Sequence, residues 1–148
     1  MNMRHMAWKM KMDEINYQTF DTELINQVLS IYEKNGWTAY LDDLEKLKRS
    51  FENSLYVLGA FDNGLLVGFI RCVGDGEHIV FIQDLIVDPD YHRQGIGKKL
   101  YSLASNHFKD VRTFLLITDA DDTRSNSFYQ AMGMTDNNKT CPLKTYIR

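Results

Sequence analysis

The chain has 148 residues, a length typical of one domain, and 20 acidic against 17 basic residues give it a formal net charge of −3. Hydrophobic residues make up 44% of it and aromatic residues 12%, which is enough for a packed core and argues against a disordered chain. There is no basic excess and no apolar run of about 18 residues, so neither nucleic acid nor a membrane is an expected partner.

The number and spacing of the cysteines indicate their redox state and whether they could bind a metal. Cys72 and Cys141 are the two cysteines, and they lack the spacing and the histidine pair of a zinc site. We expect two reduced thiols and no metal site. The N-terminus has no continuous apolar stretch of the kind found in signal peptides, so the expected location is cytoplasmic.

The first half of the chain predicts one strand and then two helices. Apolar residues at every second position over residues 6–12 predict the strand. Apolar residues at three- and four-residue spacing predict a helix that begins near Asp21 and ends at Asn35-Gly36. The same spacing predicts a second helix over Thr38–Asn53.

The second half predicts a hairpin and then alternating strands and helices. Asp62-Asn63-Gly64 lies between two apolar runs, which is a strong hairpin signal. The expected elements are, in order, strands over Leu55–Phe61, Leu65–Val73 and His78–Val87, a helix over Gly95–Lys109, a strand over Thr113–Thr118, a helix over Thr123–Met132, and one or two returning strands within Thr135–Arg148.

The segment from Phe81 to Leu100 reads as strand, turn, glycine-rich loop and helix. Gly95 and Gly97 lack a Cβ, so a ligand can approach the backbone closely. The first N–H groups of a helix have no intrahelical partner, and the helix dipole favours an anion there. We therefore expect a pyrophosphate site, although an ordinary strand–turn–helix junction explains the glycines as well. The loop lacks the Gly-x-x-x-x-Gly-Lys-Ser/Thr pattern of a P-loop. It is not the dinucleotide motif Gly-x-Gly-x-x-Gly either, because residue 100 is Leu.

Two motifs in this order are similar to those of the GNAT superfamily of N-acetyltransferases. Val87–Gly97 resembles the family's acetyl-CoA loop, with His92 at the usual Gln or Arg position. Asp122–Met134 resembles the second motif, with Asp122 in place of Asn. The resemblance covers the chain from about Met10 to its end. It implies an α/β (α+β) fold, with a mixed, mostly antiparallel sheet of six to seven strands flanked by four helices in one domain over residues 1–148.

The resemblance also implies where acetyl-CoA binds and which groups act on it. The backbone of Leu85–Val87 would pair with the pantetheine arm and supply the oxyanion donor, and Tyr129 would protonate the leaving thiolate. Trp37 and Tyr40 would line the acceptor pocket, or else serve as core aromatics. The remaining cofactor-binding residues implied by the resemblance are Arg93, Gln94, Gly95, Ile96, Gly97 and Lys98 at the pyrophosphate, and Asp122 and Asn126 in the second motif.

A general base is needed because an alkyl amine, with a pKa near 10.4, arrives protonated. Asp84 is the candidate, since it lies on the strand that precedes the oxyanion segment and shares a face with Ile82 and Ile86. A carboxylate among apolar neighbours is costly to bury unless it has a role or a partner. The alternative is that Asp84 pairs with a cation or caps a loop.

The resemblance implies an N-acetyltransferase that moves an acetyl group from acetyl-CoA to a primary amine by direct attack in a ternary complex. The acceptor is a small-molecule amine or a protein amine, and a homodimer is a further partner that the family allows. A non-catalytic acyl-CoA-binding regulatory module is the alternative, motivated by His92 and Asp122. A domain whose glycine loop binds some other phosphate ligand is a third interpretation.

Overall fold

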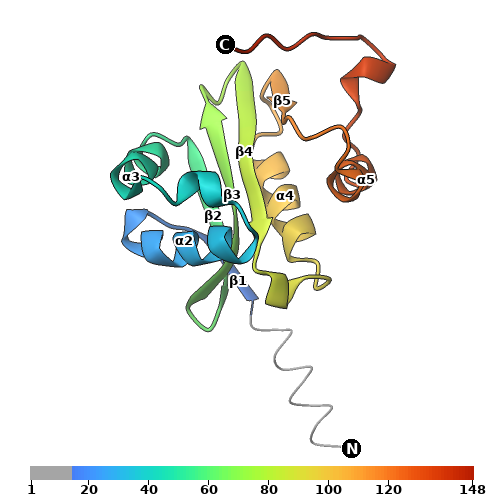
Figure 1. Ribbon diagram of the computed structural model, residues 1–148. Coiled ribbons are helices and arrows are strands. Elements are labelled where there is room, and N and C mark those ends of the chain that lie inside the picture. Colours follow the sequence, from blue (N-terminus) through green and yellow to red (C-terminus); the bar gives the residue numbers. More distant parts are fainter. Residues whose placement is uncertain (1–14) are drawn as a thin grey trace, which may run out of the picture. The chain divides into compact units, whose positions relative to one another are not determined.

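The computed structural model describes residues 15–148, so the strand predicted over residues 6–12 lies outside the described residues. The described chain divides into two compact units, residues 15–116 and 117–148. Figure 1 shows the elements along the chain. The strands and α-helices are β1 (Ile15–Thr19), α2 (Ile25–Lys34), α3 (Leu44–Glu52), β2 (Tyr56–Asp62), β3 (Leu65–Gly74), β4 (Ile79–Val87), α4 (Ile96–His107), β5 (Thr113–Leu115) and α5 (Thr123–Ala131).

The first unit is built on one sheet in which the strands follow their sequence order, β1-β2-β3-β4-β5. Neighbours from β1 to β4 are antiparallel, and β4 pairs with β5 in parallel. The predicted mixed, mostly antiparallel sheet and the four helices are confirmed. Residues 15–148 hold five strands rather than the six to seven expected.

Three predictions differ from the structure. The strand expected over Thr113–Thr118 ends at Leu115, and the other two differences have local reasons. The helix expected over Thr38–Asn53 is interrupted, because Asp43 Oδ1 accepts a hydrogen bond from the Lys46 N–H at 2.9 Å and starts α3 at Leu44. Thr38–Tyr40 forms a separate 3₁₀ turn. The return strand predicted within Thr135–Arg148 is wrong: Asp136 caps a 3₁₀ turn over Asn137–Lys139, and no strand follows β5 in the described chain.

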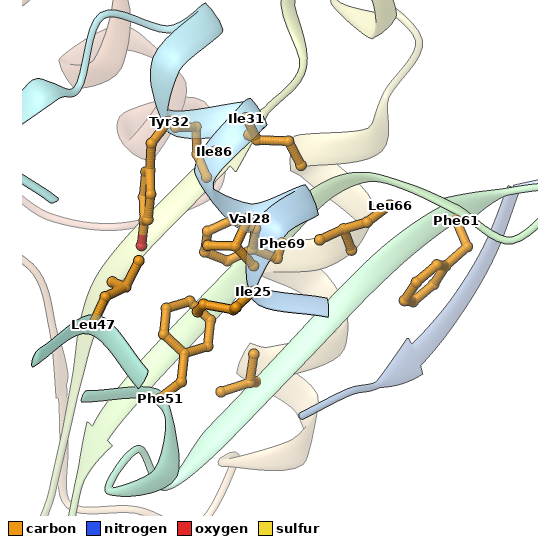
Figure 2. Packing of buried hydrophobic residues seen from close by; sticks show 11 residues of the cluster. Ile25, Val28, Ile31, Tyr32, Leu47, Phe51, Phe61, Leu66, Phe69 and Ile86 are labelled. Carbon is orange, nitrogen blue, oxygen red and sulfur yellow. The ribbon is translucent and has the colours of Figure 1, made fainter. Parts of the chain in front are cut away.

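Helices α2 and α3 lie against one face of the sheet, and α4 lies on the other (Figure 1). Leu47 and Phe51 of α3 point toward the α2 side chains over the sheet residues Phe69 and Ile86 (Figure 2). Burial of each such side chain contributes roughly 1.5–3 kcal/mol, so this layer is a major source of stability for the unit. Tyr32 is fully buried in it and carries a hydroxyl into an otherwise apolar cluster.

The turn between β3 and β4 fixes where β4 begins. Asp75 Oδ1 accepts hydrogen bonds from three backbone N–H groups, at 2.8–3.0 Å, of residues 77–79. Gly74 enters the turn at φ +138°, and a Cβ there would lie 2.3 Å from the carbonyl oxygen of Ile79. Glycine is therefore required at position 74 for the turn to close.

We expect Gly74→Ala to destabilise the protein by roughly 1–3 kcal/mol more than Gly64→Ala, because only the first forces a backbone overlap. Gly64 also has a positive φ, +85°, but a Cβ there meets nothing within 4 Å. Gly64→Ala therefore measures only the cost of placing a residue with a Cβ at positive φ. Urea unfolding of both variants measures the difference. Equal losses would contradict the requirement.

Candidate active site

Strand β4 has an open outer edge along its second half. Its pairing with β5 ends at Phe81 and Leu115, so Ile82–Val87 have no strand partner on that side within residues 15–148. On the other side the register with β3 shifts: Arg71 pairs with Asp84 and Cys72 with Ile82. Gln83 is therefore the extra residue of a β-bulge, a feature that is over-represented next to active sites.

The register decides which backbone groups of β4 face the open edge. Asp88 donates its N–H to the Val67 carbonyl at 2.8 Å, so the N–H of Asp88 faces β3. In an antiparallel ladder the bonded pairs alternate. The N–H of Ile86 therefore points to β3, whereas the N–H groups of Leu85 and Val87 point to the open edge. Of the three residues expected to bind the pantetheine arm, two present donors there.

The loop after β4 holds two residues in left-handed backbone conformation before α4 begins. Gly95 is the N-cap at φ +77°, and no described side chain caps the helix. A Cβ built on Gly95 meets nothing within 4 Å, so it faces open space. Arg93 has φ +62°, which is strained for a residue with a side chain and is the kind of strain found at ligand sites. The first N–H groups of α4 thus remain available to an anion.

The carbonyl of Val87 anchors the start of this loop. It accepts hydrogen bonds from Asn35 Nδ2 and from His92 Nε2, each at 3.1 Å, so this histidine nitrogen carries the proton. Next to it Lys34 Nζ lies 2.7 Å from Asp88 Oδ2. The end of α2 is therefore fixed to the end of β4. The departure at His92 has a structural use in this chain, because its ring holds the loop.

Asp84 is the centre of a buried polar network, and its side chain is 0% exposed. Oδ2 accepts from Arg71 Nε and from the Tyr32 hydroxyl, both at 2.7 Å. Oδ1 accepts from the Tyr40 hydroxyl at 3.0 Å. Arg71 Nη1 also donates to Ser54 at 3.2 Å. The expected carboxylate among apolar neighbours is thus present, and so is the cationic partner of the alternative interpretation.

The surroundings perturb the partners of Asp84. Burial and the neighbouring carboxylate raise the pKa of Tyr32 far above its usual range, and the same two causes raise the pKa of Tyr40. Burial lowers the pKa of Arg71, but the Asp84 carboxylate overcomes this and the net direction is upward. Both tyrosines therefore stay neutral hydrogen-bond donors to Asp84 at physiological pH.

The two aromatic residues expected at the acceptor stack on Tyr32. The ring centroids of Tyr32 and Tyr40 are 4.5 Å apart with planes at 17°, and those of Tyr32 and Trp37 are 6.0 Å apart at 20°. Trp37 keeps 38% of its surface exposed, and Tyr40 is partly exposed. Both residues anchor the loop and still present surface to solvent, so the two predicted roles are compatible.

The second unit carries the other predicted motif. Asp122 caps α5: Oδ1 accepts from the Ser125 N–H at 3.0 Å and Oδ2 from the Ser125 hydroxyl at 2.6 Å. These bonds to Ser125 lower the pKa of Asp122. Asn126 Nδ2 donates to the carbonyls of Asp119 and Asp122 at 2.9 and 2.7 Å. Tyr129 lies further along α5, with its ring against Phe128 at 5.3 Å.

Sequence reasoning missed Arg71, Tyr32 and Gln83. The sequence does contain a signal for Arg71, because it is the one charged residue in the apolar run Leu65–Val73. A buried cation requires a buried anion, and the next strand supplies Asp84. The bulge that exposes Gln83 has no comparable signal, since it depends on how two strands pair.

Three further observations bound the site. No group of three or more His, Cys, Asp or Glu residues could hold a metal ion in the described part of the chain. No helix within residues 15–148 has the length and apolar character needed to cross a bilayer. A cavity of about 300 Å³ opens between the end of β1, the end of α3 and the start of β2, and none of the predicted site residues lines it.

The open edge of β4 and the uncapped start of α4 lie next to each other along the chain. Residues 22–134 match the model of the acetyltransferase (GNAT) family, so this chain belongs to that family. An uncharacterized N-acetyltransferase, ycf52-like, of Prochlorococcus marinus is 30% identical over 122 residues, which cover 80% of this chain and 64% of that protein. The chain thus spans a little under two thirds of that relative.

Solved structures give the same assignment. A GNAT family acetyltransferase of Streptococcus pneumoniae TIGR4 is 35% identical, with a TM-score of 0.74 over 90% of this chain and 96% of that one. An N-acetyltransferase of Thermoplasma acidophilum, solved in complex with coenzyme A, is 21% identical, with a TM-score of 0.65 over 79% of this chain and 87% of that one. The second likeness shows the fold alone.

We expect Arg71→Met to cost about 3–5 kcal/mol of stability, because it leaves the Asp84 charge buried without its cation. Asp84→Asn in the Arg71→Met background should recover part of that loss, since no buried charge remains. Urea unfolding measures both. Lys34→Met is the matched control: it removes a cation that is 45% exposed and should cost much less. A loss no larger than that of the control would show that the buried pair is dispensable.

Proposed function

We propose that this chain is an acetyl-CoA-dependent N-acetyltransferase in which a primary amine attacks the thioester directly in a ternary complex. The observation that carries the proposal is the open edge of β4 running into the uncapped mouth of α4. An extended arm can pair with the first, and a pyrophosphate can bind at the second. Family membership supports the same reaction.

In this proposal the pyrophosphate binds residues 93–98. The backbone N–H groups of Gln94, Gly95, Ile96 and Gly97 contact its oxygens, while Arg93 and Lys98 add positive charge. The left-handed conformations at positions 93 and 95 support this role, because left-handed residues next to right-handed ones are the backbone arrangement of anion-binding loops. The cost of holding Arg93 in that conformation is then offset when the ligand binds.

The acetyl carbonyl lies at the open edge of β4 in this proposal. Leu85 or Val87 donates its N–H to the developing oxyanion, and the other binds the pantetheine arm, while Ile86 holds the strand to β3. A fixed donor of this kind contributes about 2.7–4 kcal/mol to the transition state. Positioning of the amine against the carbonyl supplies much of the remainder.

Two groups handle protons. Asp84 is proposed as the final proton acceptor of the acceptor amine, working through an intervening group because its side chain is 0% exposed. Tyr129 is proposed to protonate the CoA thiolate. Asp122 and Asn126 order the loop that begins α5, and we propose that they meet the cofactor through that loop. Trp37 and Tyr40 are proposed to contact the acceptor.

Gly95→Ala tests the helix mouth. Its Cβ would enter the space proposed for the pyrophosphate, so the Kd for coenzyme A should rise about tenfold or more, equivalent to about 1.4 kcal/mol. Gly64→Ala imposes a similar positive φ in open space on the β2–β3 turn and should leave that Kd unchanged. Isothermal titration with coenzyme A, and with ATP for comparison, gives the values. Tighter binding of ATP in the wild type would instead favour a different phosphate ligand.

Tyr129→Phe tests catalysis as opposed to binding. We expect kcat for thiol release from acetyl-CoA to fall about 100-fold or more, because the leaving thiolate loses its acid, while coenzyme A still binds. Tyr146→Phe, on a side chain that is 89% exposed, is the control and should leave both quantities unchanged. A wild-type protein that binds coenzyme A but releases no thiol across a panel of amines and peptides would be the non-catalytic module instead.

A further inference from the structure

We propose that the hydroxyl oxygen of Tyr40 is the group that accepts a hydrogen bond from the acceptor nitrogen, and that the side-chain amide of Gln83 now occupies the position of that nitrogen. The Tyr40 hydroxyl is then the intervening group through which Asp84 acts on the acceptor, and Asp84 itself does not touch it. The inference rests on the proposed acetyltransferase function and deepens it, since it states what the acceptor must offer: a neutral nitrogen that carries an N–H.

The direction of the Tyr40 hydroxyl follows from its partner. Tyr40 lies 3.0 Å from Asp84 Oδ1, and a carboxylate can only accept, so the tyrosine proton points at Asp84. The remaining lone pairs of the tyrosine oxygen point elsewhere. Any other group that bonds this oxygen must therefore donate a hydrogen.

Gln83 already fills this position with a nitrogen donor. Its Nε2 lies 3.1 Å from the Tyr40 oxygen and donates to it. Gln83 is exposed and is the extra residue of the bulge on β4, beside the open edge proposed for the acetyl group. An amide nitrogen that donates to Tyr40 at this point has the hydrogen-bonding character of an incoming amine, which would replace it.

The acceptor cannot easily bond Asp84 itself. The Oδ2 atom of Asp84 already accepts hydrogen bonds from Arg71 and Tyr32, and the Asp84 side chain has no exposed surface. Tyr40 covers Oδ1 and is the one of the three partners of Asp84 with appreciable exposure. The hydroxyl of Tyr40 is thus the outer end of the network.

The charges favour a neutral amine over an ammonium. An open carboxylate at the acceptor would stabilise the charged, non-nucleophilic form of the amine. Here Arg71 neutralises Asp84 at 2.7 Å, and the acceptor meets a hydroxyl lone pair instead. The nitrogen can then keep its own lone pair for the thioester carbonyl while one N–H points to Tyr40.

The test measures thiol release from acetyl-CoA with three acceptor probes: 2-phenylethylamine, spermidine and a short lysine-containing peptide. With the probe that the wild type uses best, Tyr40→Phe should raise the acceptor KM about tenfold and leave the acetyl-CoA KM unchanged. The ring that stacks on Tyr32 is retained in this variant. Tyr32→Phe is the control: it removes a hydroxyl from the same carboxylate at a fully buried position and should lower the Tm without raising the acceptor KM.

Gln83→Ala makes the test specific. It removes the competing donor, so the acceptor KM should fall about twofold or more in the wild-type background and stay unchanged in the Tyr40→Phe background. Equal acceptor KM values for wild type and Tyr40→Phe would overturn the inference, as would a Gln83→Ala effect that is the same in both backgrounds. No thiol release by the wild type with any probe would reject the proposed function first, and the inference with it.

Discussion

The ion pair between Arg71 and Asp84 is the interaction on which the architecture of this site depends. Two charges are taken out of water on neighbouring strands, a cost that only close geometry and further hydrogen bonds can offset. Tyr32 from α2, Tyr40 from the loop before α3, and Ser54 after α3 supply those bonds. The pair therefore specifies how β3, β4 and the helical layer fit together, because each partner comes from a different element.

The bulge at Gln83 belongs to the same constraint. Arg71 lies directly opposite Asp84, and the extra residue beside this pair disrupts the ladder there. Beyond the bulge, β4 continues without β5 and exposes the N–H groups of Leu85 and Val87. A strand edge left open in this way invites another extended chain, which a pantetheine arm can supply without a second protein. The buried ion pair and the strand edge proposed for the cofactor thus lie on adjacent residues of one strand.

Patterns that are local in sequence were predictable, and patterns that depend on pairing were not. Hydrophobic spacing predicted three of the four helices of residues 15–148, α2, α3 and α4, and the Asn63-Gly64 turn predicted the hairpin. The position of Asp84 on the core face followed from simple alternation. Its partners Arg71 and Tyr32 lie 13 and 52 residues away in sequence, so no short window contains them. The strand predicted in the C-terminal segment was wrong for another reason. The Asp136 side chain caps a 3₁₀ turn there, and this turn takes the place of the strand.

The departures at His92 and Asp122, which motivated the non-catalytic alternative, have structural explanations, and this weakens the argument for a non-catalytic module. The ring nitrogen Nε2 of His92 donates to the Val87 carbonyl. The backbone N–H of His92 donates to the Pro89 carbonyl at 3.3 Å, within the turn before the loop. Asp122 uses both carboxylate oxygens on Ser125, an arrangement that suits an acid because the N-terminus of a helix favours negative charge. Since each substitution makes bonds that stabilise the motif in which it occurs, neither needs lost catalysis to account for it.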